Sequence, residues 1–335
     1  MLFGNLVTHG FKNNEIFGTN NHNNSTEPFI ALRNALKEHS IEINTEDINI
    51  GNKVSFEIHI DKHSINTSNI PIFLFLWEPP NVRPENTSID IKKYKKIYTW
   101  DDKLVSTKKY EKFFLPVTRN NISNIPKFHE REGFCCAISI NKAPDGKYKN
   151  DLYIERLKTY EWFEKNEPND FHLYGIGWDR PLKKGIFKNI TISKIIAKLD
   201  IKADNFVNTY KGLVDSKAKV LQKYKYSVCY ENSYGLNGHV TEKIFDSMFA
   251  GCIPVYWGAK NISTYIPEEC YIDRRNFLNN KSLYEYLKSI DEKTYHNYQK
   301  SINNYFKTDR FNKFSIEYFA NKISSDIIEN IKIIS

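Results

Sequence analysis

The sequence predicts an α/β protein with two Rossmann-like domains, each built around a mainly parallel sheet. The chain has 335 residues, which is more than one ordinary core holds. Hydrophobic residues make up 40% and charged residues 26%, a composition typical of globular proteins. Short apolar runs alternate with amphipathic stretches along most of the chain, and this alternation is the pattern of βαβ units.

The first half predicts one helix followed by a series of strands. The helix opens at Pro28, a residue suited to a first turn, with Thr26 as a candidate cap. The run from Ile70 to Trp77 is almost unbroken in its apolar character, so we expect a strand buried on both faces. The predicted strands of this half cover 41–43, 54–60, 70–77, 97–100 and 113–117.

A turn signal at Pro144-Asp145-Gly146 follows a further apolar strand, 134–138, and we place the domain boundary there. The predicted domains are 1–148 and 149–312, followed by a C-terminal amphipathic helix, 313–335. The second half repeats the alternation, with helices expected at 153–165, 193–199, 241–250, 282–290 and 294–306 and strands at 171–174, 226–230 and 253–257.

The charge and cysteine content narrow the class of protein. The formal net charge of +8 fits an anionic ligand, but the basic residues are scattered and form no nucleic-acid motif. The five cysteines fall mostly inside apolar runs, without metal-ligand spacing, so we expect buried, reduced thiols. The N-terminus lacks the pattern of a signal peptide and no run reaches membrane-spanning length. These features favour a cytoplasmic protein, with peripheral contact at the inner membrane face as an option for the tail helix.

The most informative segment runs from Tyr226 to Phe277. A buried strand ends in Glu231 and Asn232, a glycine-containing loop follows, and a helix begins near Thr241. We expect Gly251 to end this helix in a left-handed conformation. A strand, a loop and a helix N-terminus in this order form an anion site, because free backbone N–H groups point at the ligand.

Two charged residues in the first turn of that helix fit a nucleotide. Lys243 adds a positive charge at the end where the helix dipole does not favour one, and a bound pyrophosphate would explain it. Glu242 is suited to accept hydrogen bonds from ribose hydroxyls. The alternative is an ordinary Glu-Lys pair in a helix, since strand–loop–helix units are common in α/β folds.

This segment resembles the donor-binding signature of the α-1,3/4-fucosyltransferases, glycosyltransferase family 10. The matching features, in order, are Tyr230-Glu231-Asn232-Ser233, Val240-Thr241-Glu242-Lys243, Gly251-Cys252-Ile253-Pro254-Val255, Trp257-Gly258, Ile266-Pro267 and Tyr271-Ile272-Asp273. Their order across about fifty residues makes the signal more specific than a lone short motif. The resemblance implies a bacterial-type soluble member with the GT-B architecture, two Rossmann-like domains facing a cleft. The first domain would bind the acceptor and the second the nucleotide-sugar donor.

The resemblance also implies roles for individual residues. Lys243 would contact phosphate, Glu242 the ribose, and Asn232 a further part of the donor. Lys217 matches a position that often carries a basic residue near the donor, and Arg180 matches an arginine that neutralises the diphosphate. The alternative for Arg180 is a surface arginine after a loop. The sequence shows no metal cluster and no Asp-x-Asp arrangement at a strand end, so we predict that the protein requires neither a metal ion nor a cofactor.

A carboxylate in the first domain fits the role of a general base. Glu78 follows the apolar run 70–77 and precedes two prolines, at the strand end where open α/β sheets place ligands. The family has a glutamate at an equivalent place, so the resemblance implies that Glu78 takes the acceptor proton. Glu78 as a turn-capping residue paired with Arg83 is the alternative, and Glu85 and Asp101 are competing carboxylates. His9 and His129 are further candidates for acceptor contact.

The predicted reaction is an inverting transfer of L-fucose from GDP-β-L-fucose. The acceptor would be a hydroxyl of an N-acetylglucosamine-containing glycan, joined in α-1,3 or α-1,4 linkage, as in surface polysaccharides or Lewis-type antigens. The alternatives are a transferase that uses another GDP-, UDP- or dTDP-sugar and a non-catalytic glycan- or nucleotide-binding protein. The predicted partners are therefore the donor and a glycan acceptor, and not nucleic acid.

Overall fold

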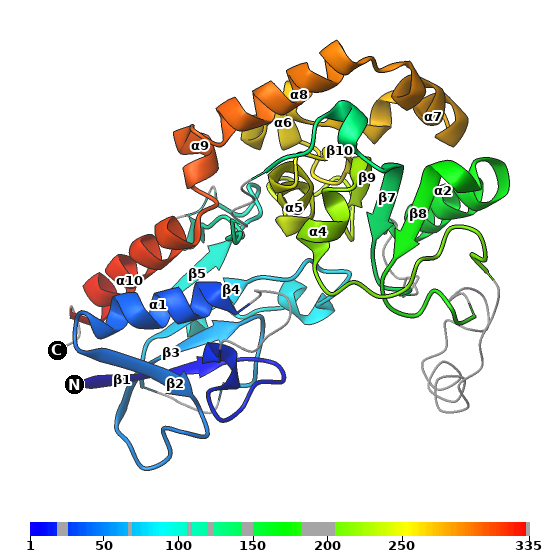
Figure 1. Ribbon diagram of the computed structural model, residues 1–335. Coiled ribbons are helices and arrows are strands. Elements are labelled where there is room, and N and C mark those ends of the chain that lie inside the picture. Colours follow the sequence, from blue (N-terminus) through cyan, green and yellow to red (C-terminus); the bar gives the residue numbers. More distant parts are fainter. Residues whose placement is uncertain are drawn as a thin grey trace. The chain divides into compact units, whose positions relative to one another are not determined.

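The computed structural model describes residues 1–18, 26–65, 69–105, 107, 109–119, 124–142, 150–181 and 205–332. The chain divides into two compact units, each described here by itself (Figure 1). Unit 1 comprises 1–118, 237–242 and 309–335, and unit 2 comprises 119–236 and 243–308. The chain therefore leaves unit 1 and returns to it twice.

Unit 1 contains a six-stranded sheet in the order β2-β1-β3-β4-β5-β6, in which every neighbouring pair is parallel. The strands are β1 (Leu2–Val7), β2 (Ile41–Thr45), β3 (Val54–Ile60), β4 (Ile72–Leu76), β5 (Lys96–Thr99) and β6 (Tyr110–Lys112). All five residues of β4 are buried, as expected for a central strand of a parallel sheet.

Two helices far apart in the sequence, α1 (Glu27–Lys37) and α10 (Ile316–Lys332), lie side by side in unit 1 (Figure 1). Phe319 of α10 packs its ring 5.9 Å from that of Phe75 on β4, and Ile323 and Ile327 are buried with it. The apolar side of the C-terminal helix therefore packs against its own unit. The short elements of unit 1 are η1 (Glu15–Phe17), η2 (Pro84–Thr87), η3 (Ile91–Lys93) and α9 (Asp309–Asn312).

Unit 2 contains a five-stranded parallel sheet in the order β11-β10-β9-β7-β8. Its strands are β7 (Gly133–Ile138), β8 (Phe171–Tyr174), β9 (Tyr224–Tyr230), β10 (Ile253–Trp257) and β11 (Ile272–Asp273). Its α-helices are α2 (Tyr153–Asn166), α4 (Lys217–Leu221), α5 (Glu242–Phe249), α6 (Ile262–Tyr265), α7 (Asn280–Ser289) and α8 (Glu292–Tyr305). The 3-10 helices are η4 (Phe128–Glu130), η5 (Pro168–Asp170), η7 (Glu268–Cys270) and η8 (Arg274–Asn276).

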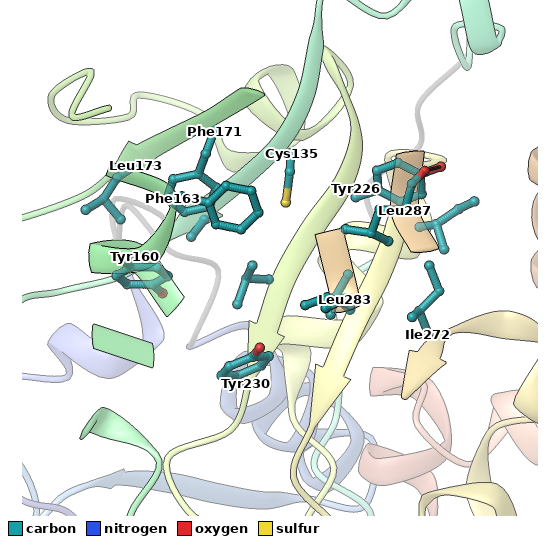
Figure 2. Close-up of a cluster of buried hydrophobic side chains, with 14 of the residues drawn as sticks. Cys135, Tyr160, Phe163, Phe171, Leu173, Tyr226, Tyr230, Ile272, Leu283 and Leu287 are labelled. Carbon is teal, nitrogen blue, oxygen red and sulfur yellow. Dashed lines mark hydrogen bonds between the residues drawn. The ribbon is translucent and has the colours of Figure 1, made fainter. Parts of the chain in front are cut away.

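The main core of unit 2 is rich in aromatic side chains, and Figure 2 shows those contributed by α2, β8 and β9. Phe163 of α2 stacks on Phe171 of β8 with ring centroids 4.6 Å apart, and Tyr160 stacks on the same ring at 5.6 Å. Burial of side chains of this size supplies most of the free energy that holds a helix on a sheet. The cysteines are buried and unpaired, as the sequence predicts.

A buried arginine joins the start of β9 to the end of α5 in unit 2. Arg131 donates from Nη1 to the carbonyl of Tyr224 at 2.7 Å and from Nη2 to the carbonyl of Gly251 at 2.7 Å. Gly251 lies just after α5 and has the predicted left-handed backbone, with φ of +66°. A positive charge at this end of α5 complements the exposed carbonyls of the last turn.

The compact units differ from the predicted domain ranges. β7 was placed in the first domain, but it pairs with β8 and β9, so the first crossover to unit 2 falls at 118/119 instead of 148. The C-terminal helix belongs to unit 1 because it packs on α1. The strand predicted at 113–117 is also wrong, since β6 ends at Lys112 and only Val117 forms a bridge, to Ser315. The helix predicted at 193–199 lies outside the described residues.

Candidate active site

Both sheets have a topological switch point, the place where open α/β sheets bind ligands at the carboxyl ends of their strands. In unit 2, β7 connects through α2 to β8 on one side, and the chain then crosses to β9 on the other side. In unit 1, β1 lies between β2 and β3 in the same manner. The predicted donor residue Asn232 follows β9, and the predicted base Glu78 follows β4.

The end of β9 is held by a buried arginine of α2. Arg156, only 7% exposed, donates from Nη2 to the carbonyl oxygen of Glu231 at 2.7 Å and to Oδ1 of Asn232 at 2.8 Å. The carbonyl of Asn232 accepts in turn from the backbone N–H of Leu152, just before α2, at 3.1 Å. These contacts fix both the main chain and the side chain of Asn232 at the switch point.

Lys243 faces a buried carboxylate in the same unit. Its Nζ lies 3.4 Å from Oε2 of Glu231, whose side chain is fully buried, while 28% of the Lys243 side chain is exposed. Gly258, after β10, approaches this carboxylate closely, because a Cβ built there would lie 2.4 Å from Cγ of Glu231. Glu231 therefore orients the ammonium group of Lys243 at the start of α5 while leaving that group partly accessible.

The structure places the remaining donor candidates on separate elements. Glu242 is the exposed first residue of α5, and the division between the two units falls just after it. Lys217 begins α4, and its Nζ lies 3.1 Å from Oδ2 of Asp246 on α5. Arg180 follows β8 in a loop whose carbonyl groups at Gly177 and Pro181 accept from Asn141, after β7. Arg180 thus belongs to the same carboxyl edge as β7 and β9.

In unit 1, Glu78 is half-buried, and its backbone is held by hydrogen bonds to the side chain of Asp61. Oδ1 of Asp61 accepts from the N–H groups of Trp77 at 2.8 Å and Glu78 at 3.0 Å. Asn86 donates to the same oxygen at 2.7 Å and to the carbonyl of Glu78 at 3.1 Å. Of the competing carboxylates, Glu85 lies 3.5 Å from Arg83, and Asp101 accepts from the backbone of Lys103.

Two histidines meet at the switch point of unit 1. His9 follows β1 and His63 follows β3, and their rings stack with centroids 3.9 Å apart. Burial, together with the neighbouring His9, lowers the pKa of His63 to about 4, so this ring is neutral at physiological pH. His129, the other histidine considered, lies in unit 2 on η4, where its Nε2 is 3.1 Å from Glu292 of α8.

Two residues of these edges carry no signal in the sequence pattern, and the structural role of a third, Glu231, could not be predicted from the motif that contains it. Arg156 lies within the predicted helix 153–165 and has the spacing of an ordinary helix residue, so only the fold shows that it reaches β9. Asp61 follows a predicted strand, as many turn residues do. Glu231 belongs to the predicted motif, but the motif does not show that its side chain is buried beside Gly258 and contacts Lys243.

The sheet topology and the comparisons with solved structures agree on the fold. Two parallel Rossmann-like sheets form the GT-B fold of glycosyltransferases. The chain is similar over 98% of its length to a crystal structure of an alpha1,3-fucosyltransferase with GDP-fucose, of which it covers 90%, with a TM-score of 0.56 and 16% identity. At this identity the likeness shows the fold alone.

Residues 189–325 match the family model described as glycosyltransferase family 10 (fucosyltransferase) C-term. The chain is 34% identical over 83 residues to an alpha-(1,3)-fucosyltransferase of Helicobacter pylori and 31% identical over 72 residues to an alpha-(1,4)-fucosyltransferase of Arabidopsis thaliana. These matches cover 25% and 22% of this chain and 17% and 18% of the relatives' lengths. Among the described residues, no helix is long and apolar enough to cross a membrane.

Proposed function

We propose that this protein is an inverting fucosyltransferase that moves L-fucose from GDP-β-L-fucose to a glycan hydroxyl. The observation that carries the proposal is the family 10 match over 189–325, which includes Asn232, Glu242 and Lys243. The structure adds that Asn232 lies at the switch point of unit 2, and that Lys243 is in the first turn of α5. The proposed acceptor is an N-acetylglucosamine-containing glycan, in α-1,3 or α-1,4 linkage.

At the donor, the task is to stabilise a departing diphosphate. Lys243, oriented by Glu231, and the backbone N–H groups at the start of α5 supply positive potential for it. Arg180 and Lys217 are proposed as further cationic contacts, and Glu242 as the acceptor of hydrogen bonds from the ribose. We propose that these groups replace a metal ion in this role, so that chelators leave turnover unchanged.

At the acceptor, Glu78 is the proposed general base. Its carboxylate takes the proton of the acceptor hydroxyl while the hydroxyl oxygen bonds to the anomeric carbon of fucose. The bond from that carbon to the phosphate oxygen breaks on the opposite face, and GDP leaves with the electron pair. Attack from the face opposite the departing phosphate converts the β-linked donor into an α-L-fucoside. The exposed His9 ring, backed by the neutral ring of His63, is the proposed surface for an acceptor sugar.

Calorimetry with GDP, UDP and dTDP, each with and without chelator, tests the donor assignment. The proposal predicts selective binding of GDP that survives chelation. Selective binding of UDP or dTDP would keep a glycosyltransferase but reject fucose as the transferred sugar. Binding of none of the three would favour a non-catalytic glycan-binding protein.

A further inference from the structure

The loop that follows β4 has an internal support that no pattern in the sequence indicates. Asp61, directly after β3, is 3% exposed and reaches across to the end of the neighbouring strand. Its Oδ1 accepts from the backbone N–H groups of both Trp77 and Glu78. One carboxylate oxygen therefore fixes the two peptide groups that set the direction of the Glu78 side chain.

Asn86 completes this support from the other side of the loop. Its Nδ2 donates both to Oδ1 of Asp61 and to the carbonyl of Glu78, and its Oδ1 accepts from the backbone N–H of Lys62 at 2.9 Å. The N–H and the C=O of Glu78 are thus both held by one pair of side chains. We call Asp61 and Asn86 the clamp.

Asp61 combines two unfavourable features, a left-handed backbone conformation and a buried carboxyl group. Asp61 has φ of +63°, in the left-handed region that L-residues rarely adopt, although aspartate tolerates it better than most. Burial raises the pKa of the Asp61 carboxyl, and the hydrogen bonds from Glu78, Asn86 and Trp77 oppose that rise only in part. A strained backbone and a buried carboxyl at one position indicate a functional constraint.

We propose that Asp61 is a positioning residue that holds the carboxylate of Glu78 in the orientation needed to take the acceptor proton. The inference rests on the proposed role of Glu78 as the general base. It adds that transfer depends on the clamp, since small misplacements of a catalytic group cost large factors in rate. Asp61 itself touches neither the acceptor nor the donor in this proposal.

Two substitutions separate the hydrogen bonds of Asp61 from its charge. Asp61→Ala removes the acceptor for three donors, whereas Asp61→Asn keeps Oδ1 and removes only the ionisable group. We expect Asp61→Ala to lower kcat by roughly 10- to 100-fold with an unchanged Kd for GDP, and Asp61→Asn to restore kcat to within about threefold. Asn86→Ala, which removes the other half of the clamp, should lower kcat in the same direction.

A control shows whether a loss of kcat merely reports damage to unit 1. Asn49 is also buried there, and its Nδ2 donates to the carbonyl of Gly4 at 3.0 Å and to Oδ1 of Asn5 at 2.9 Å, away from the loop after β4. Asn49→Ala should lower the stability of unit 1 by a similar amount as Asp61→Ala. It should leave kcat of the folded enzyme unchanged.

The decisive readout is a double-mutant cycle between Asp61→Ala and Glu78→Gln. If Asp61 acts through Glu78, Asp61→Ala changes the residual rate of the Glu78→Gln enzyme by less than about threefold. Additive losses of kcat, or full activity of Asp61→Ala while Glu78→Gln is inactive, would overturn the positioning role. Full activity of Glu78→Gln would instead show that Glu78 is not the general base. That result would contradict the proposed function, whereas the Asp61→Ala results test only the positioning role.

Discussion

The carboxyl edges of the two sheets are supported by opposite charges. In unit 2, the cation Arg156 binds oxygen atoms of Glu231 and Asn232 at the end of β9. In unit 1, the anion Asp61 binds N–H groups of Trp77 and Glu78 after β4.

This difference has a consequence for the ligand each edge can accept. Backbone N–H groups at strand ends are natural anion sites, and Asp61 occupies those of Trp77 and Glu78 with the protein's own carboxylate. At the end of β4, unit 1 therefore supplies its own anion to these N–H groups. In unit 2 the arginine instead binds oxygen atoms, and we propose the start of α5 as the anion site.

Removing the proposed base should have the largest effect. Glu78→Gln keeps the size of the side chain but cannot take a proton, so we expect kcat to fall by about 10²- to 10⁴-fold with GDP affinity unchanged. Initial-rate kinetics and calorimetry measure the two quantities. Glu85→Gln, in the same loop region and with a side chain 37% exposed, is the matched control and should retain activity. An active Glu78→Gln enzyme would assign the base to another group.

Removal of Arg156, the cation that supports the end of β9, should have the second-largest effect. Arg156→Ala deletes buried, charge-assisted hydrogen bonds, for which we expect a loss of about 2–4 kcal/mol in the free energy of unfolding and a weaker Kd for GDP. Urea unfolding and calorimetry test this. Lys158→Ala, on the exposed side of the same helix, should change neither quantity. Unchanged GDP binding in a folded Arg156→Ala protein would separate this edge from the donor site.

Removal of Lys243, the proposed phosphate contact, should have a smaller effect, on the affinity for GDP. Lys243→Ala removes one partly exposed charge and leaves the buried carboxylate of Glu231 without this ammonium. We expect the Kd for GDP to rise by about 10-fold, the size of one charge-assisted hydrogen bond. Lys281→Ala, whose side chain is 73% exposed on α7, is the control. An unaltered Kd would remove Lys243 from the phosphate site.

The smallest expected effect is a pH dependence of stability in unit 1. The pKa of His63 is lowered from 6.5 to about 4 in the folded protein, so the neutral ring favours folding above pH 6.5. This contribution is lost as the pH falls from 6.5 towards 4. Between pH 7 and pH 5, wild-type protein should therefore lose more unfolding free energy than His63→Phe, as measured by urea titration. Parallel losses would show that His63 does not titrate in this way.

The sequence predicted the fold class and most strand positions, because parallel strands buried on both faces appear as continuous apolar runs. Ile70–Trp77 and Tyr226–Tyr230 are clear examples, and the structure has β4 and β9 there. The division into units was not predictable in this way. β7 has the same apolar character as the strands of unit 1, and only its pairing with β8 and β9 assigns it to unit 2.

The motif residues of the candidate site were predictable because they are adjacent in sequence, as Glu242 and Lys243 are. Their supports were not predictable, since Arg156 lies 75 residues from Glu231 and Asp61 lies 17 residues from Glu78. Such contacts depend on which strands become neighbours, and no local pattern contains that information. The roles of the predicted site residues remain predictions.

The anomeric configuration of the product tests the central claim most directly. NMR spectroscopy of the product formed from GDP-β-L-fucose and an N-acetylglucosamine-containing acceptor reports both the sugar transferred and the stereochemistry. The account predicts an α-L-fucoside, formed in the presence of chelator and lost in Glu78→Gln. A β-L-fucoside would contradict the inverting mechanism, and the absence of any fucosylated product would contradict the proposed activity.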